Sequence, residues 1–363
     1  MSAIRPMTPA DVPQVASLYE LIFRSRTPRA APKLAPYFER ILLRNPWFDP
    51  EVPSLVYEAD RGRIVGFIGS HVRRMSFEGA RVRLAVPSTF ISDPRERNRT
   101  AGAFLLRRFL SGPQDLTITD GATVPVQRIW ERLGGHTAHF RSLAWTRMYR
   151  PFRFTGEYLS RRRGSRSARR WGRMVAPLDL PARAVPRLRS QPPDDSLSAE
   201  ELTPARLVAA LPDMVTGRLR PDYDQDFLGW LFAEMARVAT RGDLVRKLVR
   251  GSDGAAMGWY VAYLMDSGPC EVMQIMAGAQ GVEPVLDHLL HTADQMGATA
   301  VQGAVDGRLL EAVSRRGAFL HLSARTLIHS RRQELVNAAL GDDMMLTRMD
   351  GERWMGFHRE PFQ

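Results

Sequence analysis

The stretch that decides the fold is Ser92-Asp93-Pro94-Arg95-Glu96-Arg97-Asn98-Arg99-Thr100-Ala101-Gly102-Ala103-Phe104-Leu105-Leu106. The apolar residues 82–91 before it predict a strand, and the periodic apolar residues 101–110 predict a helix. The first N–H groups of a helix have no partner within it, and the helix dipole adds positive potential there. Arg97 and Arg99 add charge, and the next residues are small. The turn therefore predicts an anion-binding site at the helix N-terminus.

This stretch resembles the loop with which N-acyltransferases of the GNAT superfamily bind the pyrophosphate of acyl-CoA, whose pattern is Arg/Gln-x-x-Gly-x-Gly/Ala. Arg97 matches the first position and Gly102 the last, whereas Thr100 stands where the family has its middle glycine. A Cβ at this position crowds the approach of the backbone to a phosphate, so donor binding is expected to be weakened or altered. The resemblance implies an acyl-CoA site formed by Val86, Ser88, Phe90, Arg97, Asn98, Arg99, Thr100, Ala101, Gly102 and Ala103.

Three further segments match the family in the order that its fold requires. Residues 3–19 predict a short strand and then a helix capped by Thr8, with an acidic residue at the capping-box position. Residues 55–69 predict a β-hairpin. Residues 125–135 predict a helix that resembles the family's helix ending in Tyr-x-x-Leu-Gly-Phe, with Trp130 in place of the tyrosine that is often the general acid.

The second half of the chain repeats landmarks of the first. Residues 254–260 resemble the hairpin turn and strand at 62–68, and residues 313–318 resemble the helix end at 130–135. At the position of the pyrophosphate loop, residues 276–284 carry no arginine. We therefore expect a second, degenerate GNAT-like domain that has lost donor binding, with an unrelated α/β domain as the alternative.

The expected fold class is α/β, with two GNAT-like domains, each a mixed β-sheet flanked by helices. We expect an acyl-CoA-binding domain at 1–150, an Arg/Pro-rich linker at 151–195 and the degenerate domain at 196–363. Alternating aspartates before Phe227 predict a helix cap, and Asp350-Gly351 predicts the turn of a closing hairpin over 342–357.

The formal net charge of +12 is concentrated in one segment. Residues 150–190 contain 12 arginines against only Glu157 and Asp179. The segment is interpreted as a solvated connector, or as a docking surface for an acyl carrier protein or an anionic membrane surface. Because the excess charge belongs to a linker and not to a domain face, the sequence does not favour nucleic-acid binding.

Cysteine content and hydropathy limit the remaining classes. Cys270 is the only cysteine, which excludes a disulfide framework and a thiolate metal site, and no metal is expected. No apolar run approaches 18 residues and no signal-peptide core is present, so we expect a cytoplasmic protein. Lys33 and Lys247 are the only lysines, a bias that suggests a GC-rich bacterial genome.

Transfer of an acyl group from a thioester to an amine needs a neutral amine, a polarised carbonyl and a proton for the leaving thiolate. The strand expected to bind the thioester, residues 84–91, carries no acidic residue, so the family's frequent glutamate base is absent there. Trp130 is a poor acid at neutral pH. The substitutes proposed for catalysis are Glu58, His71, Ser88, Thr89 and Tyr149.

The resemblance implies an N-acyltransferase that moves an acyl group, with acetyl as the first expectation, from acyl-CoA to an amine of a small molecule, sugar or peptide. One alternative is a long-chain acyltransferase whose donor is carried by an acyl carrier protein. Another is a non-catalytic acyl-CoA-binding or scaffold protein, which the changes at Thr100 and Trp130 favour. The sequence carries no signature of the acceptor.

Overall fold

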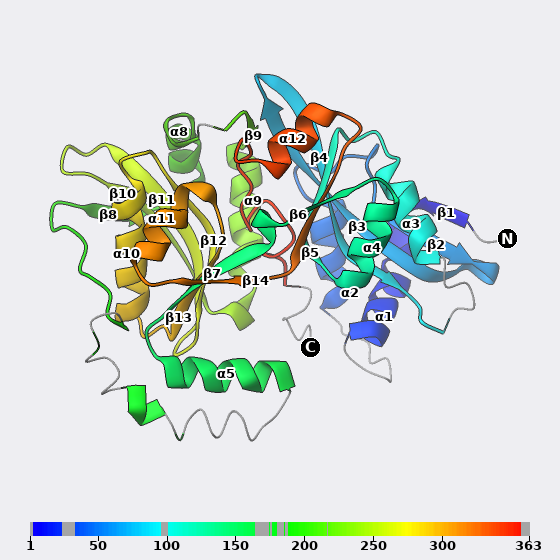
Figure 1. Cartoon of the computed structure of the whole chain (residues 1–363). Helices are drawn as coiled ribbons and strands as arrows, with labels where there is room; N and C mark the ends of the chain where they lie inside the picture. Colours follow the sequence, from blue (N-terminus) through cyan, green and yellow to red (C-terminus); the bar gives the residue numbers. More distant parts are fainter. Residues whose placement is uncertain are drawn as a thin grey trace.

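The computed structural model describes residues 3–23, 33–95, 101–163, 174, 176–179, 185, 188–215 and 217–356. The chain forms two mixed β-sheets flanked by helices, which confirms the predicted α/β class (Figure 1). Four residues of the predicted pyrophosphate loop, Arg97 to Thr100, lie outside the described residues.

The first sheet has eight strands. Its main path runs β1 (Ala3–Pro6), β2 (Leu55–Ala59), β3 (Arg63–Phe77), β4 (Ala80–Ser92), β5 (Leu116–Ala122), β15 (Arg325–His329) and β6 (His136–Ala138), and β9 (Leu219–Pro221) pairs with β3. All neighbours are antiparallel except β4 and β5.

The second sheet has seven strands. Its order is β14 (Phe319–Leu322), β7 (Leu143–Met148), β13 (Ala300–Ala304), β12 (Cys270–Ala277), β11 (Ala256–Leu264), β10 (Asp243–Arg250) and β8 (Ser198–Glu201). Here the parallel pair is β12 and β13, which take the places that β4 and β5 have in the first sheet. This correspondence agrees with the repeat expected from the sequence.

Helices pack against both sheets. On the first half of the chain they are α1 (Val12–Phe23), α2 (Leu34–Phe38), α3 (Ala101–Leu110), α4 (Val124–Arg132) and α5 (Pro151–Arg163). On the second half they are α8 (Pro204–Met214), α9 (Gln225–Ala236), α10 (Val282–Gln295), α11 (Gly307–Arg315) and α12 (Gln333–Leu340). The single-turn elements are η1 (Pro9–Asp11), η2 (Glu39–Leu43), η3 (Asp60–Gly62), η4 (Phe140–Ser142), η5 (Ala176–Leu178) and η7 (Ala239–Arg241). Within the described part of the chain, no helix is long and apolar enough to span a bilayer.

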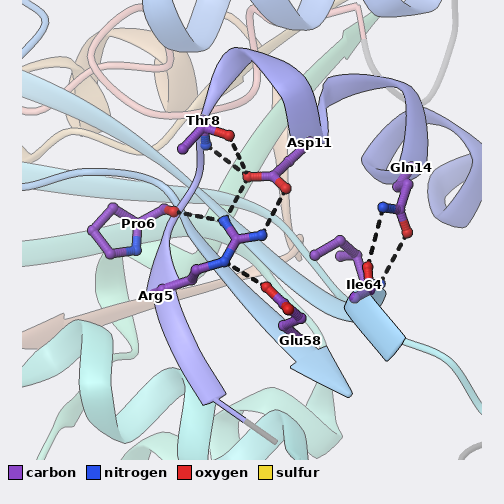
Figure 2. Close-up of polar contacts among 8 residues, drawn as sticks. Arg5, Pro6, Thr8, Asp11, Gln14, Glu58 and Ile64 are labelled. Atoms are coloured by element: carbon purple, nitrogen blue, oxygen red, sulfur yellow. Dashed lines mark hydrogen bonds and ion pairs between the residues drawn. The ribbon is translucent and has the colours of Figure 1, made fainter. Parts of the chain in front are cut away.

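The N-terminus is fixed by one arginine. Arg5 donates hydrogen bonds to both carboxylate oxygens of Asp11, at 2.7 and 2.8 Å, and to Glu58 at 2.6 Å (Figure 2). The backbone N–H of Thr8 also donates to Asp11, at 2.8 Å, which forms the predicted capping box. These bonds, led by the one from Arg5, lower the pKa of Asp11 to about 2. The network ties the entry of α1 to β1 and β2.

The two sheets exchange strands. β7, from the first half of the chain, lies between β13 and β14, and β15, from the second half, lies between β5 and β6. The apolar core also mixes the halves, because Trp47 stacks on Phe227 of α9 with ring centroids 3.6 Å apart. The predicted domain boundaries therefore divide the chain but not the sheets.

The segment after α12 runs between the sheets and contacts both (Figure 1). The backbone N–H of Met349 donates to Met273 of β12, whereas Glu352 accepts a hydrogen bond from Thr119 of β5. The hairpin predicted over 342–357 is wrong for its described part, where no strand forms. Asp350 instead accepts hydrogen bonds from the backbone and hydroxyl of Thr347, which closes a compact turn.

Candidate active site

The parallel strands β4 and β5 separate where they leave the sheet core. They pair only at Leu84 with Leu116 and at Ala85 with Thr117. Farther along, β4 bulges against β3, and Thr89 takes a φ of 51°, in the left-handed region that β-branched residues rarely adopt. The divergence opens a wedge between the two strands, with Thr89 on one side of it.

Glu352 occupies this wedge. Its carboxyl accepts a hydrogen bond from Thr119 Oγ1 at 2.8 Å and another from the backbone N–H of Thr89. Its own backbone N–H donates to Asp120 Oδ1 at 2.9 Å. The carboxyl is therefore held by both strands, at the point where they part.

The surroundings make Glu352 titrate near neutrality. Enclosure by the protein, followed by repulsion from the Asp120 carboxylate, raises the pKa of Glu352 to about 7. The hydrogen bond from Thr119 and the charge of Arg353 act in the opposite direction but are weaker. Burial also raises the pKa of Asp120. Glu352 can accordingly accept and release a proton in the range where a general base operates.

A second polar pair lies next to the bulge. His71 Nε2 and Ser88 Oγ are 2.8 Å apart, and both side chains are buried. Burial lowers the pKa of His71 well below its usual value, so the imidazole is neutral. Gly69 makes room for this pair, because a Cβ at position 69 would lie 2.7 Å from Ser88 Oγ. The adjacent Thr89 Oγ1 is buried and has no hydrogen-bond partner among the described residues.

The start of α3 faces the same strand. The helix begins at Ala101 as predicted, and the Cα of Gly102 packs close to Phe90 and Ser92 of β4. A Cβ at position 102 would be 3.4 Å from the Phe90 ring. The first turn of α3 contains no acidic side chain, so its N–H groups keep their positive potential. Of the predicted donor-binding residues, Val86, Ser88 and Phe90 lie on β4, and Ala101, Gly102 and Ala103 open α3.

Two of the predicted catalytic residues lie elsewhere. Glu58 is on β2, two strands from β4, where Arg5 pairs with it (Figure 2). Tyr149 is completely buried beside the second sheet and donates its hydroxyl to the carbonyl of Leu290 at 3.0 Å. Their positions give both residues structural roles and correct the expectation that they act on substrate. The geometry brings His71, Ser88 and Thr89 together.

A cavity of about 330 Å³ lies beside the wedge, between the two sheets. One wall carries Gly121 and Glu352, and the other carries Glu271, Met273 and Gln302 from β12 and β13. The remaining lining residues are Ala144, Arg241, His321, Ser323, Ala324, Arg348, Arg353 and Met355. The cavity thus joins the predicted donor strand to the second half of the chain.

Sequence reasoning missed Glu352 and Asp120. Neither belongs to the strand that the resemblance implicated, and Glu352 follows a dipeptide that was interpreted as a hairpin turn. The available signal was the carboxylate within the largely apolar segment 344–357, where a surface hairpin would place more polar residues. The structure describes no group of three or more metal-binding side chains in the part of the chain that it covers.

The chain matches no protein-family model and no curated protein. Its fold is similar to a probable N-acyltransferase from Enterococcus faecalis V583, with a TM-score of 0.59 and 10% identity over 91% of this chain and 73% of that one. A GCN5-related N-acetyltransferase from Kribbella flavida gives 0.54 and 12% over 90% and 70%. Eis1 from Mycobacterium abscessus gives 0.53 and 15% over 93% and 76%. The predicted GNAT-like fold is therefore confirmed as a fold.

Proposed function

We propose that this protein is an N-acyltransferase that passes an acyl group from acyl-CoA to a primary amine, with Glu352 as its general base. The observation that carries the proposal is the Glu352 carboxyl, which lies between β4 and β5, has a pKa of about 7 and lines the cavity. A general base is most effective when its pKa is close to the working pH. The likeness of the fold to N-acetyltransferases supports this reaction class.

The donor and acceptor approach from opposite sides in this proposal. The N-terminus of α3 and the arginine-rich turn before it supply positive potential for the donor's phosphates. The thioester then reaches Thr89, whose unpartnered hydroxyl is available to the pantetheine arm or the carbonyl. The amine enters through the cavity and meets the thioester beside Glu352.

The transfer itself follows from these positions. The neutral amine attacks the thioester carbonyl carbon, a C–N bond forms and the C–S bond breaks. Glu352 takes the proton that the amine nitrogen loses, and the thiolate leaves as the free thiol after taking a proton from solvent or a neighbouring acid. A carboxylate at this point also favours the approach of the amine through its negative charge.

The identity of the donor is a separate part of the proposal. Acetyl-CoA is the first donor to test, and a longer acyl chain on CoA or on an acyl carrier protein is the alternative. A carrier protein is acidic enough to dock on basic residues in 150–190. Much of that segment lies outside the described residues, so its docking role stays a prediction.

The test is turnover by the Glu352→Gln variant. We expect kcat/KM for the amine to fall by about 10² to 10⁴ because the general base is lost. Binding of acyl-CoA, followed by native mass spectrometry, should persist because Glu352 is on the acceptor side. Glu334→Gln is the matched control, since Glu334 is exposed on α12 and pairs with Arg332.

Two outcomes would contradict the proposal. Wild-type rates in Glu352→Gln would remove Glu352 from the mechanism. Donor binding without release of thiol across a broad amine panel would favour the non-catalytic acyl-CoA-binding protein instead.

A further inference from the structure

The cavity contains three arginines, of which one is fully engaged. Arg241 lies 3.3 Å from Glu271 and also donates to the main-chain carbonyls of Arg353 and Met355. Its charge is balanced by Glu271, and its remaining bonds hold the C-terminal segment in place. Arg241 is thus part of the cavity's frame.

Arg348 and Arg353 are bound differently. Arg348 is buried, and its Nη1 lies 3.4 Å from the carbonyl of Gln302 and 3.5 Å from that of Val272, both long for a hydrogen bond. Arg353 donates to Ser323 Oγ at 3.0 Å. Across the described ranges, neither guanidinium has a carboxylate oxygen within 4.0 Å that would count as an ion pair. Burial, followed by repulsion from Arg353, lowers the pKa of Arg348 to about 9.

The nearby carboxyls do not balance these charges at neutral pH. Glu271 is paired with Arg241, and the pKa values of Asp120 and Glu352 are both raised, so part of their negative charge is lost to protonation. A buried guanidinium without an anion is costly, and a bound anion relieves the cost. The cavity is therefore poorer in negative charge than its arginines require.

We propose that the acceptor is a small amine that also carries an anionic group, a carboxylate or a phosphate, which Arg348 and Arg353 bind while the amine faces Glu352. This inference rests on the proposed transferase function. Guanidinium groups match both anions in geometry and charge. The cavity's volume of about 330 Å³ is at the low end for small-molecule sites, so the bound part has the size of an amino acid or a sugar phosphate.

The experiment compares amines that differ only in the anion. The pairs are 4-aminobutyrate with butylamine, phosphoethanolamine with ethanolamine, and glucosamine 6-phosphate with glucosamine. We measure kcat/KM with acetyl-CoA, and binding to the donor-free protein by titration calorimetry. The anionic member of at least one pair should be preferred by about tenfold or more, as charged hydrogen bonds allow. The first pair reports on carboxylates and the other two on phosphates.

Variants assign the preference to the two arginines. Arg348→Gln and Arg353→Gln should each reduce the ratio toward one, and Arg348→Lys should restore part of it. Arg353 is only half-buried, so its variant remains informative if Arg348→Gln fails to fold. Arg220→Gln, an exposed arginine on β9, removes the same charge outside the cavity and should keep the ratio.

Failure of this inference and failure of the transferase function give different results. Equal or better turnover of the neutral amines would overturn the anion inference while the transferase stands. Absence of turnover with every amine would reject the transferase. In that case calorimetry decides the inference: preferential binding of the anionic members that is lost in Arg348→Gln supports it, and equal or undetectable binding of both members overturns it.

Discussion

Glu352 lies directly against the Cα of Gly121. A Cβ at position 121 would be 2.9 Å from the carboxyl carbon of Glu352, closer than real Cβ contacts. Gly121→Ala should therefore displace the carboxyl from its place between β4 and β5. We expect kcat to fall by about tenfold to 10² and stability to fall by about 1–3 kcal/mol.

Gly229→Ala is the control for that substitution. Gly229 lies within α9, and no atom is within 4 Å of the position of its missing Cβ. The change should stabilise the protein by about 0.5–1 kcal/mol through helix propensity and leave turnover unaltered. Steady-state kinetics and urea unfolding measure both variants. Wild-type kcat in Gly121→Ala would show that the position of Glu352 is not critical.

The pH dependence of turnover follows from the pKa of Glu352. A base acts only when deprotonated, so kcat/KM should rise with pH through about 7. Because Asp120 contributes to the raised pKa, Asp120→Asn should move this midpoint to lower pH. Two acceptors with different amine pKa values separate the enzyme's titration from that of the amine. A midpoint that follows the acceptor alone would argue against Glu352.

The same pKa shift has a cost for folding. The pKa of Glu352 is raised from 4.5 in the unfolded chain to about 7 in the folded protein, so the folded state binds this proton more tightly. The ionised form then destabilises the fold increasingly between pH 4.5 and 7, and the cost is complete above 7. Glu352→Gln should stabilise the protein by about 1–2 kcal/mol at pH 8 and by nearly nothing at pH 4. Urea unfolding at both pH values tests this, and destabilisation at pH 8 would contradict it.

Asp11 and Glu58 allow a structural role to be separated from a catalytic one. Asp11→Asn should cost about 1–2 kcal/mol at pH 7, because the lowered pKa of Asp11 stabilises the fold above pH 3.8 and the benefit is lost as pH falls toward 2. Glu58→Gln should cost less than about 1 kcal/mol, since its ion pair with Arg5 is partly exposed. Both variants should keep kcat/KM within about twofold. A loss of 10² or more in Glu58→Gln would restore the catalytic role first expected for it.

Local signals in the sequence were sufficient for local structure. The Thr8 cap, the turn at Asp60–Gly62 and the start of α3 at Ala101 depend on neighbouring residues, and each occurs where predicted. Asp224 likewise caps α9, as expected, by accepting a hydrogen bond from the N–H of Phe227 at 2.7 Å. Short-range hydrogen bonds and helix periodicity are encoded within a few residues, which makes them predictable.

The site itself depended on contacts that no local pattern encodes. Asp350-Gly351 is typical of a hairpin turn, which needs a positive φ at the glycine, yet Gly351 has none. Its lack of a Cβ serves close contact with the Asp120 carboxyl from another part of the chain. The same holds for β15, whose partners β5 and β6 lie about 200 residues earlier.

The exchange of β7 and β15 predicts that the two halves do not fold separately. A fragment of residues 1–150 lacks the strand between β5 and β6, and its own β7 lacks both partners. An unpaired strand exposes main-chain groups and apolar residues such as Trp145, which is buried in the second sheet. Each fragment alone should show no cooperative unfolding transition, whereas coexpressed fragments should assemble as a 1:1 complex. The full chain with a protease site at residue 168 is the control, and after cleavage it should stay assembled with nearly unchanged Tm. A cooperative transition in the 1–150 fragment alone would show that the first sheet closes without β15.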